Sequence, residues 1–321
     1  MSDTGKQVSN PFSTGGGGVS FETEVQASFV VLMFTGGYAP CLPCWAISKI
    51  KLQGRFAGYE TDDLIVFAQD PGGEEHKLLG QVKHSITISE NDATFAEVIQ
   101  AAWNDYNNQE VFSQGKDALA LITGPLSATD IDDVRSILEW ARSSEDSAEY
   151  FTKIQLAKFS SDGKRRKLKA FRESLKKANS GCDVTDDTIH GFLKHFHLLG
   201  YDLDVRASIV RSLLHSLICQ YSPEGARSLW ARVVEEVRHA NQEAGTISMA
   251  KLPDDLRVAF SPRVATVIPT ELTPHKPMAA AKDWNTDENA GSLAYACLVG
   301  GWDENSNADR ELMSTLSATP F

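Results

Sequence analysis

The chain lacks the features that mark membrane proteins, secreted proteins and disulfide-stapled domains. Among its 321 residues, no apolar run reaches the roughly 18 residues that a bilayer-spanning helix needs. The N-terminus has no basic segment followed by an apolar core, so no secretory signal is visible. The five cysteines are scattered and odd in number, which suits free thiols in a reducing compartment. We therefore expect a cytoplasmic protein with no membrane partner.

A positive net charge and a nucleotide-binding loop are missing too. The formal net charge of −12 argues against a surface covered with nucleic-acid contacts. No GxxxxGK followed by Ser or Thr occurs, so the sequence excludes ATP binding through a Walker A loop. Basic residues are nevertheless concentrated at 153–177, where ten Lys or Arg stand against two acids. This stripe either tracks a phosphate backbone or is a solvated helix face. Its centre supplies the candidate DNA contacts Lys164, Arg165, Arg166, Lys167 and Lys169.

What is present is the composition of an ordinary globular chain, with 42% hydrophobic and 23% charged residues. Apolar periodicity predicts a helix from an N-cap at Ser20, strands at 45–53, 64–67 and 76–85, a helix from Asn91 or Asp92 to Tyr106, a strand at 118–124 and a helix capped by Thr129. The order α-β-β-β-α-β-α predicts an α/β fold, with a mixed sheet flanked by helices.

The remaining sequence changes character after about residue 150, where the strand signals fade. We expect a flexible arm at 1–19, an α/β domain at 20–150 and an all-helical module at 151–260. The Pro-rich text that follows predicts a linker and C-terminal segment at 261–321. That segment reads as the possible start of a further domain that this chain does not contain.

Polar residues interrupt two apolar strands where a buried sheet would not need them. Asp63 immediately precedes one strand, and Gln81 and Lys83 project to the same face of the next. Mg²⁺ prefers hard oxygen ligands. Asp63 offers a carboxylate oxygen, Gln81 an amide oxygen and Val82 a backbone carbonyl oxygen, and Glu22 from the first helix offers a second carboxylate. Lys83 could orient a water or offset phosphate charge. Each residue taken alone is better explained as an ordinary surface or turn residue, so only the combination indicates a metal-dependent hydrolase.

The segments that carry these residues resemble a known nuclease superfamily. GGGGVSFETEVQASF, YETDDLIVF, LLGQVKHSITIS and FAEVIQAAWNDY resemble the PD-(D/E)XK restriction-like nucleases. They are more closely similar to the double-stranded-DNA endonuclease domain of bacterial antiphage effectors, namely CBASS effectors and the N-terminal region of antiviral STAND NTPases. The resemblance implies a restriction-endonuclease-like fold over about residues 15–145, with a metal site formed by Glu22, Asp63, Gln81 and Lys83. Asp62 competes with Asp63, and we favour Asp63 because it adjoins the strand.

The resemblance implies a Mg²⁺- or Mn²⁺-dependent endonuclease that cuts double-stranded DNA with little sequence specificity. It also implies a role in antiphage defence and activation by homo-oligomerisation. LAYACLVGGWDENSNADRELMSTL is similar to the segment that follows the nuclease in antiviral STAND proteins, where an NTPase and a sensor come next. Gln81 stands where many superfamily members carry an acid, which removes one negative charge from the site. The alternative is therefore a catalytically inactive, nuclease-like domain for DNA binding, scaffolding or assembly.

Overall fold

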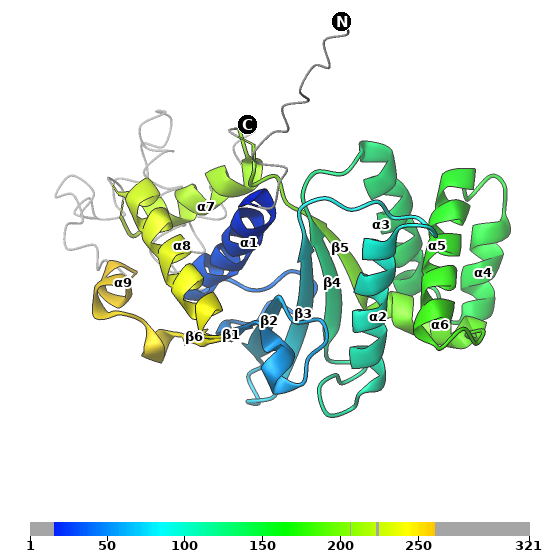
Figure 1. Cartoon of the computed structure of the whole chain (residues 1–321), viewed down its shortest axis with the longest axis horizontal. Helices are drawn as coiled ribbons and strands as arrows, with labels where there is room; N and C mark the ends of the chain where they lie inside the picture. Colours follow the sequence, from blue (N-terminus) through cyan, green and yellow to red (C-terminus); the bar gives the residue numbers. More distant parts are fainter. Residues whose placement is uncertain (1–15, 206, 223–224, 261–321) are drawn as a thin grey trace, which may run out of the picture. The chain divides into compact units, whose positions relative to one another are not determined.

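A mixed six-stranded sheet with the strand order β5-β4-β3-β2-β1-β6 forms the centre of the protein (Figure 1). The computed structural model describes residues 16–205, 207–222 and 225–260, all within one compact unit. The strands are β1 (Ile47–Leu52), β2 (Leu64–Gln69), β3 (Glu75–Lys83), β4 (Ala118–Thr123), β5 (Phe196–Gly200) and β6 (Thr246–Ser248). β6, β1, β2 and β3 pair antiparallel, whereas β3, β4 and β5 pair parallel. The predicted α/β class with a mixed sheet is confirmed.

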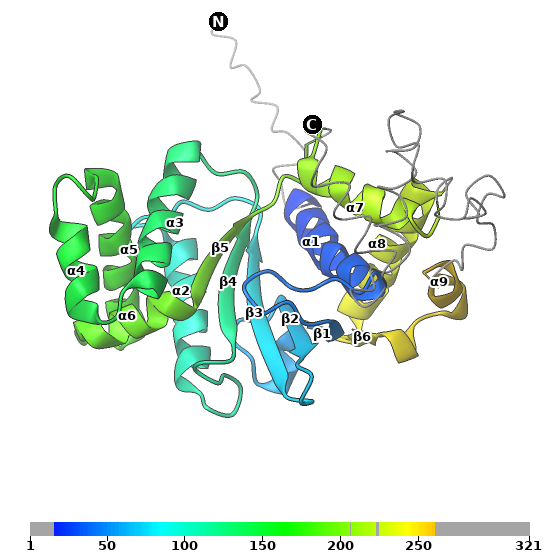
Figure 2. The same cartoon turned by 180° about the vertical axis from the view of Figure 1, so that it is seen from behind.

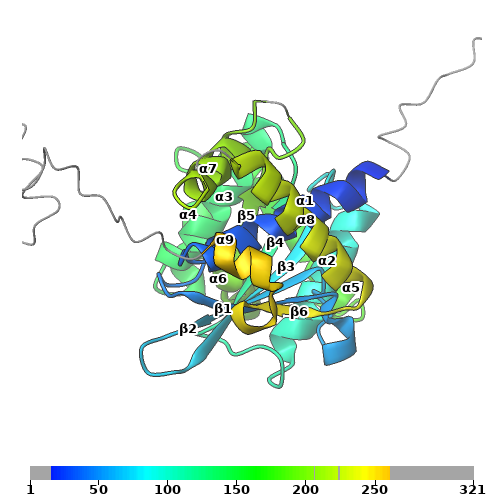
Figure 3. The same ribbon diagram turned by 90° about the vertical axis from the view of Figure 1, so that its left-hand side faces the viewer.

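Helices cover both faces of the sheet (Figures 1 and 2). One face packs on α1 (Gly16–Phe34), α7 (Ile209–Cys219), α8 (Ala226–Gln242) and α9 (Asp254–Ala259). Figure 3 looks onto this group, with α8 and α9 in front. The other face packs on α2 (Ala93–Asn107), α3 (Ala128–Ser143), α4 (Ser147–Gln155), α5 (Asp162–Ala178) and α6 (Asp186–His195). Two short 3₁₀ turns, η2 (Gly54–Ala57) and η3 (Met249–Lys251), lie in the connections.

Helix α1 is enclosed between the sheet and α8, so most of its circumference is buried. Phe21, Val25 and Phe29 are at most 3% exposed, as the apolar stripe predicts. The fully buried side chains also include Gln26, a polar residue that needs partners at this depth. A helix that is apolar almost all round is expected in the interior of a protein rather than on its surface.

Local capping chemistry explains where two helices begin and corrects two predicted caps. The Asp92 carboxylate accepts the Phe95 amide at 2.7 Å, which confirms one of the two predicted caps of α2. Ser127 rather than Thr129 caps α3, because its hydroxyl accepts the amide of the third residue after it. Ser20 is not a cap, since α1 already begins at Gly16.

The predicted all-helical module at 151–260 is wrong in two places. Strand β5 pairs with β4, and β6 pairs with β1, so this segment supplies both edges of the central sheet. A boundary near residue 150 does not separate two compact units either, because the described residues on both sides of it belong to one unit. These strands are short, and an apolar run such as FHLL carries no alternation to distinguish it from buried helix.

Two of the predicted segments fall wholly or largely on residues outside the described ranges. These are the first 15 residues of the predicted arm and the predicted linker and C-terminal segment at 261–321. The rest of the predicted arm, 16–19, is helical. Within the described ranges, no helix has the length and apolar character needed to cross a membrane.

Candidate active site

One end of the sheet brings the predicted site residues together. In the β2–β3 ladder Leu64 pairs with Gly80, which places Asp63 beside Gln81. The Gln81 side-chain Nε2 donates to Asp63 Oδ2 at 2.5 Å, and Lys83 Nζ lies 3.8 Å from the same oxygen. Antiparallel pairing places the start of β2 beside the end of β3. The hairpin register therefore brings Asp63 together with Gln81 and Lys83, which follow it by 18 and 20 positions in the sequence.

The backbone of β3 fixes the orientation of the Asp63 carboxylate. The Val82 N–H donates to Asp63 Oδ2 at 2.7 Å, so the observed contact of Val82 is through its amide. The role of the Val82 carbonyl as a metal ligand remains a prediction. Asp62 turns elsewhere, with its carboxylate 3.6 Å from the Arg55 guanidinium. Of the two adjacent acids, Asp63 is the one that faces Gln81 and Lys83.

Glu22 reaches the same end of the sheet from α1 and is held by two amide side chains. Gln53 Nε2 donates to Glu22 Oε1 at 2.9 Å, and Gln26 Nε2 lies 3.1 Å from the same oxygen. Gln26 Nε2 also donates to the Asp63 carbonyl at 2.7 Å. Gln26 thus joins the helix that carries one acid to the strand entrance that carries the other.

Burial, with a smaller contribution from a neighbouring acid, raises the pKa of both Glu22 and Asp63. Desolvation, followed by the charge of Asp63, raises the pKa of Glu22 from 4.5 to about 7, against the opposing effects of Lys83 and of the two amide donors. Desolvation likewise raises the pKa of Asp63, against the charge of Lys83 and the hydrogen bond from Val82. A partly desolvated carboxyl group near a second acid favours either a bound proton or a nearby cation.

Three residues that the sequence reading missed complete this polar group. Gln53 lies just after β1, Gln26 lies on α1, and Asn241 lies on α8. Asn241 Nδ2 donates to Gln26 Oε1 at 2.6 Å, which directs the Gln26 amide nitrogen toward Glu22 and Asp63. A signal for Gln26 was present, because it lies four residues after Glu22, on the same side of the helix, and within the mostly apolar stretch at 25–34. For Asn241, 215 residues away from Gln26, the sequence offers no comparable signal.

The donor set fits Mg²⁺ or Mn²⁺, which bind proteins through one or two carboxylates and retain several waters. Hydrogen bonds to the two acids fall on Glu22 Oε1 and Asp63 Oδ2. The pKa of each acid is raised because its ionised form is unfavourable in this place, and a divalent cation between the two acids would offset that free-energy cost. Gln81 contacts Asp63 through nitrogen, so the structure places it as a donor that holds this carboxylate. Direct ligation by its oxygen stays a prediction.

The central residues of the basic segment lie on α5, where most of them form ion pairs with acidic side chains. Four of its five predicted DNA contacts pair with acids, which lowers their availability to phosphate. These pairs are Lys164 with Asp132 and Asp133, Arg165 with Asp162, Lys167 with Asp130, and Lys169 with Glu90. Arg166 is exposed. Of the two readings of this stripe, the ion pairs favour the solvated helix face, and DNA contact by it stays a prediction.

Comparisons with known proteins give only a distant structural match. No family model matches the chain, and no curated protein matches it. Two solved structures of the Cap4 SAVED/CARF-domain-containing receptor of Acinetobacter baumannii match with TM-scores of 0.41 and 0.42 and identities of 12% and 13%. The first of them contains the cyclic trinucleotide 3'3'3'-cAAA. Each match covers 72% of this chain, but only 42% and 44% of the receptor chains. Similarity at this level assigns no function to the chain.

Proposed function

We propose that the protein is a metal-dependent nuclease that hydrolyses phosphodiester bonds of double-stranded DNA. The observation that carries the proposal is the convergence of Glu22, Asp63, Gln81 and Lys83 from α1, β2 and β3 at one end of the sheet. Two carboxylates, an amide and a lysine in one small volume form a group that is suited to a cation, an attacking water and a phosphate.

Each residue has a distinct task in this proposal. Asp63 and Glu22 would hold the divalent cation, which supplies an activated water and charge stabilisation when bound. Lys83, with its side chain 32% exposed, lies where a phosphate oxygen can approach from solvent, and its charge would offset that of the reacting phosphate. Gln81 and the Val82 amide hold the Asp63 carboxylate in one orientation, which limits the reorganisation needed when the cation binds.

The substrate and biological setting rest on the resemblance of the sequence to antiphage endonuclease domains. Double-stranded DNA, little sequence specificity, activation by self-association and a downstream NTPase or sensor belong to the proposal on that basis. The acidic chain, with its net charge of −12, gives little long-range attraction for DNA. Self-association would compensate for this, because several weak sites on one DNA molecule bind with a higher combined affinity.

The test is cleavage of supercoiled plasmid by the full chain with Mg²⁺ or Mn²⁺, over a range of protein concentrations. Lys83→Ala removes the proposed phosphate contact, and EDTA removes the cation. Lys251→Ala is the matched control, because Lys251 is exposed on η3, away from the site. We expect cleavage by the wild type and by Lys251→Ala, and none by Lys83→Ala or in EDTA.

The outcomes separate the proposal from its alternative. Plasmid binding without cleavage at every metal and protein concentration would favour the inactive DNA-binding or assembly domain. In that domain, the Gln81 amide would serve only to hold Asp63. Cleavage that persists in Lys83→Ala would place the active site elsewhere or reveal a contaminating nuclease.

A further inference from the structure

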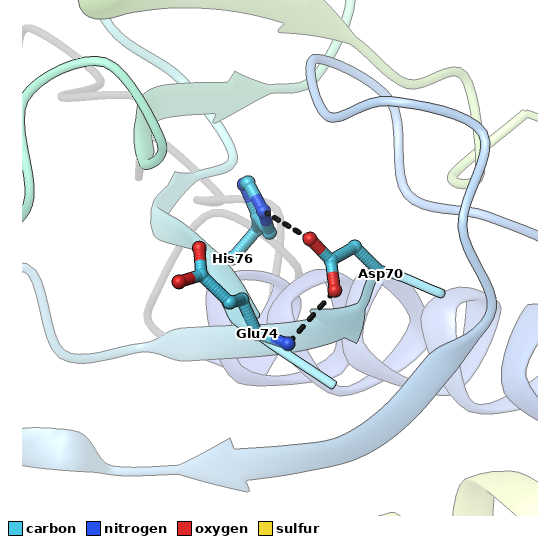
Figure 4. A group of neighbouring side chains, drawn as sticks. All are labelled: Asp70, Glu74 and His76. Atoms are coloured by element: carbon cyan, nitrogen blue, oxygen red, sulfur yellow. Dashed lines mark hydrogen bonds and ion pairs between the residues drawn. The ribbon is translucent and has the colours of Figure 1, made fainter. Parts of the chain in front are cut away.

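A second group of metal-ligating side chains lies in the β2–β3 turn. Asp70, Glu74 and His76 each offer one ligand atom, and these atoms all lie within 4.8 Å of one another (Figure 4). Asp63 precedes β2 and Asp70 follows it. The strand between them spans about 20 Å at about 3.3 Å per residue, so this turn is separate from the proposed nuclease site.

The buried ring of His76 points its Nε2 atom into this group. The residue is only 8% exposed. Its Nδ1 lies 3.2 Å from the Lys116 carbonyl, which can only accept, so Nδ1 donates to it and Nε2 is the ring nitrogen left to face the two acids. Nε2 faces Asp70 Oδ2 at 3.8 Å, too far for a hydrogen bond. A cation placed between this nitrogen and the Asp70 carboxylate would bind both, with the imidazole as a neutral ligand.

The surroundings hold the three side chains in place. The Trp45 indole packs against the His76 imidazole with ring centroids 4.4 Å apart, which limits rotation of the imidazole. The Asp70 carboxylate accepts the Glu74 backbone N–H at 2.8 Å. Lys116, whose carbonyl holds His76, also pairs through Nζ with the Glu74 carboxylate at 2.5 Å. A histidine whose second nitrogen is tied to a backbone carbonyl has the outer-sphere arrangement typical of metal ligands.

We propose that Asp70, Glu74 and His76 bind a divalent transition metal such as Zn²⁺ or Co²⁺ at the β2–β3 turn. One imidazole nitrogen and two carboxylate oxygens suit these ions, whereas Mg²⁺ and Ca²⁺ prefer oxygen alone. Tetrahedral bonds of about 2.0–2.1 Å separate ligand atoms by roughly 3.4 Å. The ligand atoms lie within 4.8 Å of one another, so the side chains close by at most about 1.4 Å on binding. The bound ion would clamp the turn that sets the register of β2 against β3.

Co²⁺ is the probe, because it is paramagnetic and quenches tryptophan fluorescence at short range. The experiment titrates the full chain carrying Asp63→Asn, which disables the proposed nuclease site, and follows both Co²⁺ stoichiometry and emission. We expect one equivalent bound with quenching of Trp45. His76→Gln abolishes both signals, and Trp45→Phe retains binding but loses most of the quenching. His239→Gln is the matched control, since His239 is largely exposed on α8.

Glu74→Gln provides an arm that does not depend on a buried residue. Glu74 is exposed, so its substitution leaves the fold intact and weakens Co²⁺ binding by roughly tenfold or more. Equal Co²⁺ stoichiometry and affinity in His76→Gln, Glu74→Gln and the parent would overturn the site. So would binding seen only at millimolar Co²⁺, which would leave His76 and Asp70 as an ordinary ion pair. Cleavage of DNA is not a readout here, so this result stands independently of the nuclease assay.

Discussion

Glu22→Gln is expected to stabilise the protein while it abolishes DNA cleavage. The carboxylate of Glu22 is held in a partly buried place beside Asp63, and its pKa is raised from 4.5 to about 7, chiefly by desolvation. An amide at this position never ionises, and its oxygen can still accept from Gln53 and Gln26. The variant therefore keeps the two hydrogen bonds and removes the cost of a buried charge.

The size and pH window of the effect follow from proton linkage. Between 4.5 and about 7 the folded wild type binds the proton that the unfolded chain releases, so the free energy of unfolding falls as the pH rises through this window. The cost is absent below 4.5 and fully present above 7. At about 1.4 kcal/mol per pH unit it amounts to at most about 3.5 kcal/mol. We expect Glu22→Gln to gain about 1–3 kcal/mol at pH ~8, and roughly 2–4 °C in Tm per kcal/mol.

Thermal and chemical unfolding in EDTA at pH ~5, ~6.5 and ~8 measure this difference, since EDTA keeps a divalent cation from masking it. Glu97→Gln is the matched control, because Glu97 is exposed on α2. A Glu22→Gln protein that is less stable than the wild type at pH ~8 would refute the reasoning. So would an equal gain at pH ~5 and ~8, because a gain without pH dependence cannot come from the charge of Glu22.

Three further substitutions test the contacts around the site. Gln81→Glu places a second carboxylate against Asp63, so Tm in EDTA falls by several degrees and Mn²⁺ affinity rises about tenfold or more, as calorimetry would show. Asn241→Ala releases the Gln26 amide, so the cleavage rate falls roughly tenfold. The loss is larger below pH ~7, because the ionised form of Glu22 is hardest to maintain there, and a uniform loss across the pH profile would contradict this. Lys164→Ala leaves a buried acid of α3 without its cation, so urea denaturation shows a loss of about 1–3 kcal/mol, while the salt dependence of DNA binding stays unchanged.

Part of the candidate site could be read from the sequence because it is local. Asp63, Gln81 and Lys83 lie on adjacent strands of one hairpin, and the period of two places Gln81 and Lys83 on one face. The position of Glu22 follows from the apolar stripe of the helix that carries it. The fold class followed in the same way, from apolar runs separated by strong turn signals.

The edges of the sheet could not be read in this way. Strands β5 and β6 are five and three residues long, and short apolar runs inside a helix-rich segment carry too little pattern to be assigned as strands. The basic segment at 153–177 suggested DNA contact for a related reason. A count of residues shows how much charge a segment carries, but not which acids in the folded protein pair with that charge. Lys164 and Lys167 lie against acids of α3 that are more than 30 positions away in sequence.

The sequence by itself determined the α/β class, the order of the first seven elements and the residues that converge at the end of β2 and β3. Those features depend on local periodicity and hairpin register, which adjacent residues encode. Only the tertiary structure decided that the segment after residue 150 completes the sheet and that Asn241 of α8 orients Gln26. It also decided that His76 turns its Nε2 atom toward Asp70. These arrangements depend on packing between segments distant in the chain, and no local pattern records which distant surface a side chain will meet.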